Sequence, residues 1–187
     1  MIYIVSAITV ILLWSGVSFP AVIAAPAPIP RAADTCADPS LVIPFVQAFN
    51  PGQAAYRTLS VSTYTASITF ASNSGWVYQG EEFLAWPTPQ DFTSPFYNLF
   101  NPTTTDHMIV LSTDGSVPSA PGYEQLDGIV GYAYATQVCS SVPLLEAVYS
   151  GGSHYYTTDP IVHSQLLLQP GWTNGAIKAY VLPLPFV

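Results

Sequence analysis

Asp106 and His107 are the neighbouring residues in this sequence that come closest to a catalytic dyad. An aspartate that orients an imidazole is what lets a histidine act as a general base. Adjacent residues of a β-strand point to opposite faces, however, so we do not expect these two side chains to touch. Our interpretation is that His107, like His154 later in the chain, hydrogen-bonds the backbone of a nearby turn.

A metal site would have to combine histidines with a carboxylate from elsewhere in the chain. The candidate ligands are three histidines and two aspartates, namely His107, His154, His163, Asp106 and Asp159. None of the short ligand spacings that are typical of zinc sites occurs among them. The sequence therefore predicts neither a metal site nor a cofactor.

Nucleophilic and paired-carboxylate sites are not indicated either. The Gly-x-Ser-x-Gly pattern of a nucleophile elbow is absent. Acidic residues come close together at Glu81-Glu82 and at Glu124 with Asp127, but we interpret both groups as solvated turns. We therefore expect no catalytic residues, and a protein that is not an enzyme.

The histidines belong to a pattern that occurs three times along the chain. Each copy has a proline, then an Asn or Tyr six residues later, then an aromatic residue or histidine, then a glycine followed by an aromatic residue. The four sets are Pro44, Pro95 and Pro143; Asn50, Asn101 and Tyr149; Tyr56, His107 and His154; and Gly75-Trp76, Gly122-Tyr123 and Gly171-Trp172. A period of about 40 to 50 residues is typical of repeat architectures. We place a first, second and third repeat at about 42–93, 94–141 and 142–187, within a single domain of 36–187.

Apolar and polar residues alternate within each repeat, which predicts half-buried β-strands. In the strand that follows each proline, we expect Gln47, Asn98 and Glu146 on the polar face. Only Pro160–Gln169 has the length and leucine content of a short helix, with Asp159 as its N-cap. Three copies are too few for a propeller. We therefore expect an all-β chain whose three repeats form a closed, β-trefoil-like barrel with pseudo-three-fold symmetry.

The first residues of the chain have the composition of a targeting segment. The first charged residue is Arg31, and small residues near position 24 suit cleavage by signal peptidase. A membrane anchor is the alternative, but polar residues and a proline interrupt the apolar run early and no basic cluster follows it. We expect a signal peptide over 1–24, a mobile linker or pro-segment over 25–35, and a secreted protein.

Two cysteines, Cys36 and Cys139, each stand shortly before a repeat begins. In a three-fold barrel the starts of the repeats lie near one end, and a secreted protein favours disulfides over free thiols. We therefore predict a Cys36–Cys139 disulfide, with two unpaired buried cysteines as the alternative.

Charged residues are scarce, at 7% of the chain, with 3 Lys and Arg against 11 Asp and Glu. Binding to phosphates depends on clusters of Lys and Arg, so nucleic acid and anionic membrane surfaces are not expected partners. After cleavage of the signal peptide, we expect no association with membranes.

The residues that recur in the three copies resemble the sequence pattern of a secreted repeat family known as domain of unknown function 5648. The matching segments are FYNLFNP, DHMIVLST and GYEQLDGIVGYAY in the second repeat, and SHYYTTDP, GW and GAIKAYVLP in the third. The first repeat has Ala55-Tyr56 where the family pattern has Asp-His. The resemblance covers Val42–Pro185 and implies a secreted β-rich module that often accompanies catalytic domains. It implies no catalytic residues.

The function that best fits these features is a secreted, non-catalytic, lectin-like module that binds a glycan or cell-wall polysaccharide. Sugars stack on aromatic rings, and rings recur in the repeats, although most rings in a barrel form its core. We expect the ligand near Asp106, His107, His154 and Tyr155. A structural secreted protein is the alternative, followed by a hydrolase accessory domain or an enzyme. The sequence does not indicate the oligomeric state.

Overall fold

The computed structural model describes residues 36–70 and 75–185. The expected signal peptide (1–24) and linker (25–35) lie outside the described residues. Within the described part, no helix is long and apolar enough to cross a membrane.

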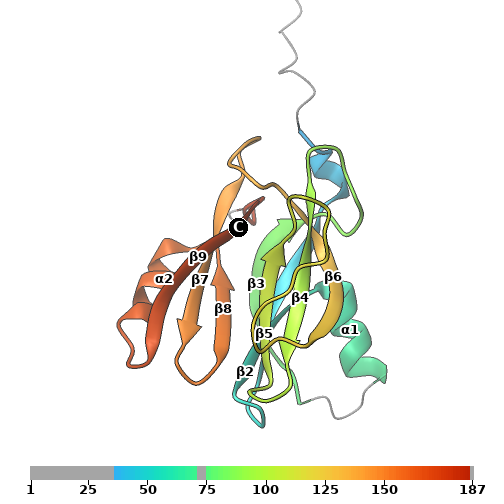
Figure 1. The fold of residues 1–187 in the computed structure, drawn as a ribbon. Coiled ribbons are helices and arrows are strands. Elements are labelled where there is room, and N and C mark those ends of the chain that lie inside the picture. Colours follow the sequence, from blue (N-terminus) through green and yellow to red (C-terminus); the bar gives the residue numbers. More distant parts are fainter. Residues whose placement is uncertain (1–35, 71–74, 186–187) are drawn as a thin grey trace, which may run out of the picture. The chain divides into compact units, whose positions relative to one another are not determined.

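The described residues form nine strands, two α-helices and one 3-10 turn (Figure 1). The first repeat contains the 3-10 turn η1 (Pro39–Leu41), then β1 (Ile43–Asn50), β2 (Ala55–Ser60), α1 (Val61–Phe70) and β3 (Val77–Ala85). The second repeat contains β4 (Ser94–Asn101), β5 (Asp106–Leu111) and β6 (Gln125–Ala133). The third repeat contains β7 (Val142–Tyr149), β8 (Ser153–Thr157), α2 (Pro160–Leu167) and β9 (Trp172–Val181).

Each repeat forms one antiparallel sheet with its first strand in the middle. The strand orders are β2-β1-β3, β5-β4-β6 and β8-β7-β9. The first two strands of each sheet make a hairpin, in which Phe49 is opposite Tyr56, Phe100 opposite His107, and Val148 opposite His154. The residues that the sequence aligns therefore occupy the same register position in all three sheets.

The three sheets contact one another without merging into one closed barrel within the described residues. Isolated bridges join the ends of their last strands in a cycle, at Trp86 with Tyr132, Tyr134 with Tyr180, and Leu84 with Leu182. The hairpin strands β2, β5 and β8 also contact each other pairwise. The structure therefore shows a β-rich chain of three antiparallel sheets, which is a coarser result than the trefoil-like barrel expected from the sequence. Within each sheet, the pairing of the first strand with the last contains register shifts.

All three sheets contribute to the main core, in which three phenylalanines from the first two sheets pack together. Phe45 stacks on Phe83 at 5.2 Å between ring centroids and packs at a tilt against Phe96 at 5.5 Å. A fully buried phenylalanine contributes about 1.5–3 kcal/mol through the hydrophobic effect. Gly131 lies against these rings, and a Cβ there would come within 2.6 Å of Phe45 Cζ. The close packing of the core thus requires glycine at this position.

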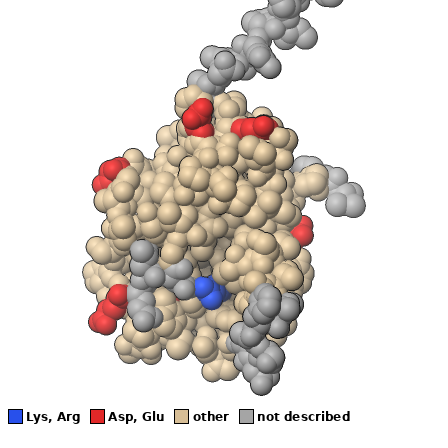
Figure 2. All heavy atoms as spheres, turned by 90° about the vertical axis from the view of Figure 1, so that its right-hand side faces the viewer, with Lys and Arg blue, Asp and Glu red and all other residues tan. Residues whose placement is uncertain are grey.

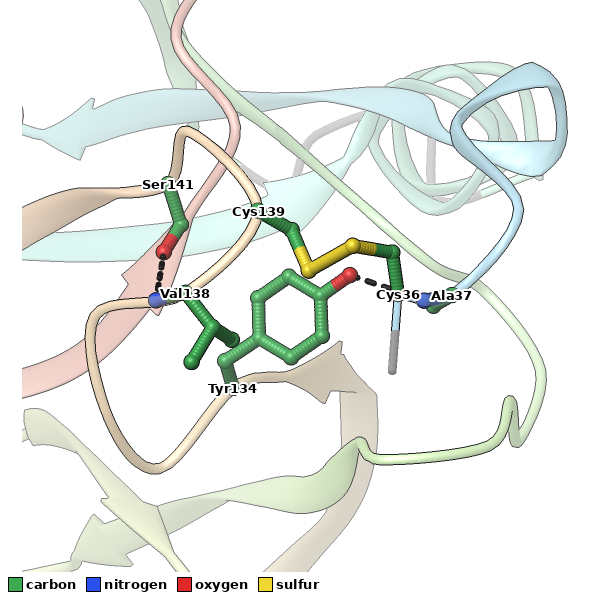
Figure 3. Close-up of a disulfide and its surroundings, with 6 residues drawn as sticks. All are labelled: Cys36, Ala37, Tyr134, Val138, Cys139 and Ser141. Atoms are coloured by element: carbon green, nitrogen blue, oxygen red, sulfur yellow. Dashed lines mark hydrogen bonds between the residues drawn. A yellow bond between two sulfur atoms is a disulfide. The ribbon is translucent and has the colours of Figure 1, made fainter. Parts of the chain in front are cut away.

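The predicted disulfide is confirmed: Cys36 is bonded to Cys139, 103 residues away (Figure 3). Beneath it the Tyr134 hydroxyl accepts a hydrogen bond from the Ala37 backbone N–H at 2.9 Å. Trp86 packs edge-on against Tyr134 with centroids 5.0 Å apart. A disulfide that closes a loop of about 100 residues adds about 4–5 kcal/mol to the free energy of unfolding. The bond ties the start of the first repeat to the segment that precedes the third.

The predicted helix after Asp159 is present as α2, and Asp159 Oδ1 accepts hydrogen bonds from the Ile161 and Val162 backbone N–H groups. The expectation that this would be the only helix was wrong, because Val61–Phe70 forms α1. Its β-branched residues favour strands. Ser60 Oγ accepts a hydrogen bond from Thr63 N at 3.2 Å, which caps the helix start. Contacts with β1 and β2 hold α1 in place.

Candidate functional site

The four residues expected at a ligand site lie mainly in the interior. Asp106, His107 and His154 have only 1%, 6% and 8% of their surface exposed, and Tyr155 is half-buried. As expected for neighbours on a strand, the side chains of Asp106 and His107 have different partners. His107 Nδ1 lies 3.0 Å from Asn98 Nδ2 within the second repeat. Asp106 instead contacts the third repeat.

Asp106 and His154 form a buried hydrogen-bonded pair across the contact between the second and third repeats. Asp106 Oδ2 lies 2.7 Å from His154 Nδ1 and also accepts a hydrogen bond from the Tyr123 hydroxyl. An ionised carboxylate only accepts hydrogen bonds, so Nδ1 of His154 carries a proton in this pair. Burial raises the pKa of Asp106, but the hydrogen bonds and charge of His154 and the Tyr123 hydroxyl outweigh it and hold the pKa below its usual value. Burial and the Asp106 carboxylate raise the pKa of Tyr123, which therefore stays a donor.

Glu146 extends this pair into a network inside the third repeat. Its Oε1 lies 2.9 Å from Lys178 Nζ and 3.7 Å from His154 Nε2, and it accepts a hydrogen bond from the Tyr156 hydroxyl at 3.2 Å. The Tyr156 hydroxyl in turn accepts from the Ile109 backbone N–H of the second repeat at 2.9 Å. Both nitrogens of His154 thus face protein carboxylates. In this geometry neither nitrogen faces a space that a substrate could occupy.

The expected polar face of the first strands is in fact buried. Gln47, Asn98 and Glu146 are each nearly inaccessible to solvent. Each of them has a partner on the second strand of its own repeat: Gln47 Oε1 accepts from Thr58 Oγ1 at 2.7 Å, Asn98 meets His107, and Glu146 meets Tyr156. A buried polar group needs such a partner to avoid a desolvation penalty of about 1–3 kcal/mol. The alternation in the sequence reflects two buried faces, one apolar and one hydrogen-bonded.

His107 lacks the carboxylate that His154 has. The residue of the first repeat that corresponds to Asp106 is Ala55, since each pairs with the last residue of the preceding strand. Burial, and then the positive charge of Arg57, lower the pKa of His107 to about 3. His107 is therefore neutral at ordinary pH, with Trp76 edge-on to it at 5.5 Å.

The same kind of ring contact joins each repeat to the next, and we call these three contacts the junctions. In each, an aromatic residue at or just before the start of the last strand of one repeat packs against the first ring of the second strand in another. The pairs are Trp76 with His107 (5.5 Å), Tyr123 with His154 (6.3 Å) and Trp172 with Tyr56 (6.1 Å). The first repeat therefore contacts the second, the second the third, and the third the first.

An aromatic pocket opens at the junction of the third and first repeats. Its volume is about 320 Å³, and its lining carries no ionisable acid or base other than tyrosine: Phe49, Ala54, Tyr56, Tyr149, Ser153, Gln169, Pro170 and Trp172. Trp172 lies 5.4 Å from Tyr149 at 44° and 6.1 Å from Tyr56 at 60°. The inclined rings give the pocket apolar walls, while hydroxyl groups and the Gln169 amide supply donors and acceptors.

The Tyr149 ring in this pocket is both exposed and closely held. It has 39% of its surface exposed. A Cβ on Gly151 would lie 2.7 Å from Cε1 of the ring, and a Cβ on Gly171 would lie 2.6 Å from Cε2. The two glycines therefore let the backbone approach both edges of the ring. An exposed aromatic ring that is already fixed loses little entropy when a ligand packs on it.

Tyr155 supports the pocket from behind. Its ring lies edge-on to Tyr56 with centroids 5.2 Å apart, and its hydroxyl donates to Glu82 Oε1 at 3.0 Å. Burial, followed by the charge of Glu82, raises the pKa of the Tyr155 hydroxyl. Of the four residues expected at the ligand, Tyr155 is therefore the one whose ring packs against a residue of the pocket wall.

A second cavity of about 660 Å³ is lined partly by acids, among them Glu81, Glu82 and Asp159. Glu82 accepts the Tyr155 hydroxyl, and Asp159 caps α2. These two carboxylates therefore already stabilise the fold. Within the described residues, no group of three or more His, Cys, Asp or Glu side chains is placed to hold a metal ion.

The surface is poor in charge. On the face drawn in Figure 2, acidic groups are scattered at the edges, a small basic area lies in a hollow, and uncharged residues cover the rest. The whole chain has a formal net charge of −8. No basic patch on this face would attract a polyanion.

The residues expected at the ligand did not include Trp172, Tyr149, Phe49 or Gln169, and Trp172 was noted only as a ring that recurs in the repeats. One signal was present: Tyr149 stands where the other repeats have Asn50 and Asn101. Those asparagines fold back on their turns, where Asn50 Oδ1 accepts from Gly52 N at 3.0 Å and Asn101 Oδ1 accepts from Thr103 N at 2.9 Å. Tyr149 cannot make this turn, and glycines form it instead.

Comparison with known proteins gives one match. The model of the family described as Domain of unknown function (DUF5648) matches residues 44–182, which include all nine strands except the first residue of β1. No curated protein and no solved structure matches the chain.

Proposed function

The chain belongs to the family described as Domain of unknown function (DUF5648), and we propose that it is a secreted, non-catalytic module that binds carbohydrate. The observation that carries the proposal is the open aromatic pocket walled by Trp172, Tyr149 and Tyr56. Small-molecule sites are typically concave and apolar with a few placed polar groups, and their volumes start near 300 Å³. The pocket has these properties.

The chemistry of the pocket suits a neutral sugar. The C–H face of a pyranose packs on aromatic rings, and its hydroxyls exchange hydrogen bonds with amide and hydroxyl groups. Gln169 and Ser153 provide such groups beside the rings. Ser153 Oγ already accepts from Tyr56 N at 3.2 Å, so its proton is free to be donated to a ligand oxygen. No Lys, Arg, Asp or Glu lines the pocket, so acidic sugars gain nothing from it.

In this proposal the residues first expected at the ligand have a supporting role. Asp106, His107 and His154 are buried and paired with protein groups, so a ligand reaches them only if the structure opens. Tyr155 packs behind Tyr56. The trefoil-like arrangement remains our interpretation of the cyclic contacts between sheets, and the disulfide is compatible with the proposed secretion.

A structural secreted protein is the alternative function, and an enzyme or hydrolase accessory domain is a weaker one. A structural protein has no need of an exposed ring that is rigidly held, as Tyr149 is. For an enzyme, the described lining of the aromatic pocket offers no acid or base other than tyrosine that could activate a nucleophile.

The test is glycan-array binding by the protein and by Trp172→Ala. We expect binding to neutral glycans, with at least about a tenfold loss in the variant, equal to 1.4 kcal/mol. Phe92→Ala is the matched control, because Phe92 is exposed and does not line the pocket. Binding should change little between low and high salt, since no counterions are displaced. The absence of binding to every glycan, or equal binding by all three proteins, would favour the structural role.

A further inference from the structure

The three junctions between repeats are built from equivalent positions but differ in their aromatic content. Each junction combines four positions: the end of a first strand, an aromatic residue at or just before the start of the last strand, and two paired residues of the neighbouring hairpin. At the junction of the third and first repeats, all four are rings: Tyr149, Trp172, Tyr56 and Phe49. These four rings are also the aromatic lining of the pocket.

The junction of the first and second repeats has fewer rings. Its four positions are Asn50, Trp76, His107 and Phe100. Asn50 lies against Gly75, where a Cβ would be 3.1 Å from Asn50 Nδ2. The space that Tyr149 fills in the pocket is therefore occupied here by an amide bonded to its own turn. At this junction, the position of Tyr149 is taken by the buried Asn50 and not by an exposed aromatic ring.

The junction of the second and third repeats is the least aromatic. Its four positions are Asn101, Tyr123, His154 and Val148. The Tyr123 hydroxyl is bonded to Asp106, and Asn101 Oδ1 accepts from the backbone of its turn. Asn101 stands at the position of Tyr149, and the hydrogen bond between Asp106 and His154 links the two repeats. This junction is specialised for holding two repeats together.

From this comparison, and resting on the function proposed above, we infer that the chain has one carbohydrate site, formed jointly by the first and third repeats. The replacement of an asparagine by Tyr149, with Gly151 and Gly171 at its edges, creates the site in one repeat only. A single site makes the chain a monovalent anchor for a glycan. It does not cross-link glycans as a lectin with a site in every repeat does.

The experiment is the stoichiometry of binding, measured by native mass spectrometry and by titration calorimetry. The probes are four neutral hexasaccharides: cellohexaose, xylohexaose, mannohexaose and chitohexaose. We expect one oligosaccharide per chain for the probes that bind. Tyr149→Asn, which installs the residue of the other two repeats, should lower affinity at least about tenfold, while Tyr149→Phe should keep it within about threefold.

The outcomes separate the inference from the function on which it rests. If none of the four probes binds, the proposed function fails. If two or three molecules bind per chain, or if a folded Tyr149→Asn keeps full affinity, the function stands and the single-site inference is wrong. If Tyr149→Asn fails to fold by circular dichroism, the stoichiometry of the unaltered protein and the result for Tyr149→Phe still decide the inference.

Discussion

Asp106 of the second repeat is paired with His154 of the third, with 2.7 Å between Oδ2 and Nδ1, although the residue next to Asp106 in the chain is also a histidine. The pleat of β5 sends His107 to Asn98 instead. Asp106 therefore stabilises the contact between the second and third repeats. The neighbouring side chains of Asp106 and His107 have different partners, one in the next repeat and one in the same repeat.

The first prediction concerns this pair. Asp106→Asn should lower the free energy of unfolding by about 3 kcal/mol, because it weakens the two hydrogen bonds that His154 and Tyr123 make to a buried, ionised carboxylate. Urea unfolding measures the change. Asp91→Asn is the control, since Asp91 is exposed and its replacement should stay within about 0.5 kcal/mol. Equal stabilities of the two variants would show that the Asp106–His154 pair does not contribute to the free energy of unfolding.

The second prediction concerns pH. Burial holds the pKa of His107 near 3, against an ordinary value of 6.5. Between these values the unfolded chain binds a proton that the folded chain does not, so stability falls as pH falls. The slope from this group is at most about 1.4 kcal/mol per pH unit. The lowered pKa of Asp106 affects stability only at lower pH. The stability that the ionised Asp106 contributes is lost as the pH falls below the ordinary pKa of aspartate.

Urea unfolding of the protein and of His107→Gln between pH 7 and pH 4.5 tests this account. The unaltered protein should lose about 2 kcal/mol more than the variant over this range. Glutamine can still meet the Asn98 amide but does not titrate. Parallel pH profiles for the two proteins would mean that His107 is not the group responsible.

The third prediction concerns the glycine at the edge of the Tyr149 ring. Gly171 has φ of +89°, and a Cβ there would lie 2.6 Å from Tyr149 Cε2. Gly171→Ala should therefore cost about 1–2 kcal/mol of backbone strain, displace the ring and reduce binding of the hexasaccharides. Calorimetry measures the binding, and urea unfolding measures the stability.

Gly115 is the matched control for this substitution. Its φ of +77° is also left-handed, but a Cβ there would have no atom within 4 Å. Gly115→Ala should show a similar strain cost and unchanged binding. If both alanine variants bind equally well, the position of the Tyr149 ring is not what forms the site.

The sequence predicted the features that depend on neighbouring residues. The strands follow from period-two alternation, and α2 follows from the Asp159-Pro160 start, because capping is a local interaction. The cysteine pairing followed from where Cys36 and Cys139 stand relative to the repeats. Helix α1 was not predictable in the same way, since its β-branched residues favour strands and its packing on β1 and β2 is not local.

The candidate site was predicted less well because it depends on contacts between repeats. Trp172 was noted only as a recurring ring, and its partner Tyr56 lies more than 100 positions earlier in the chain. The pairing of Asp106 with His154 likewise spans 48 residues. Alternation along one strand does not reveal which repeat covers which face. The same limit explains why Gln47, Asn98 and Glu146 were expected on a solvated face when both faces are covered.

The most direct test of carbohydrate binding at the aromatic pocket is an NMR titration of the indole N–H resonances, assigned with single Trp→Phe variants. Trp86 is fully buried, and its Nε1 donates to the Asp38 carbonyl oxygen at 2.7 Å, so it serves as an internal control. On addition of the hexasaccharides named above, the Trp172 resonance should shift in a saturable way while that of Trp86 stays in place. Titrations in which Trp172 does not move with any of these probes, or in which only other indoles respond, would contradict the proposed site.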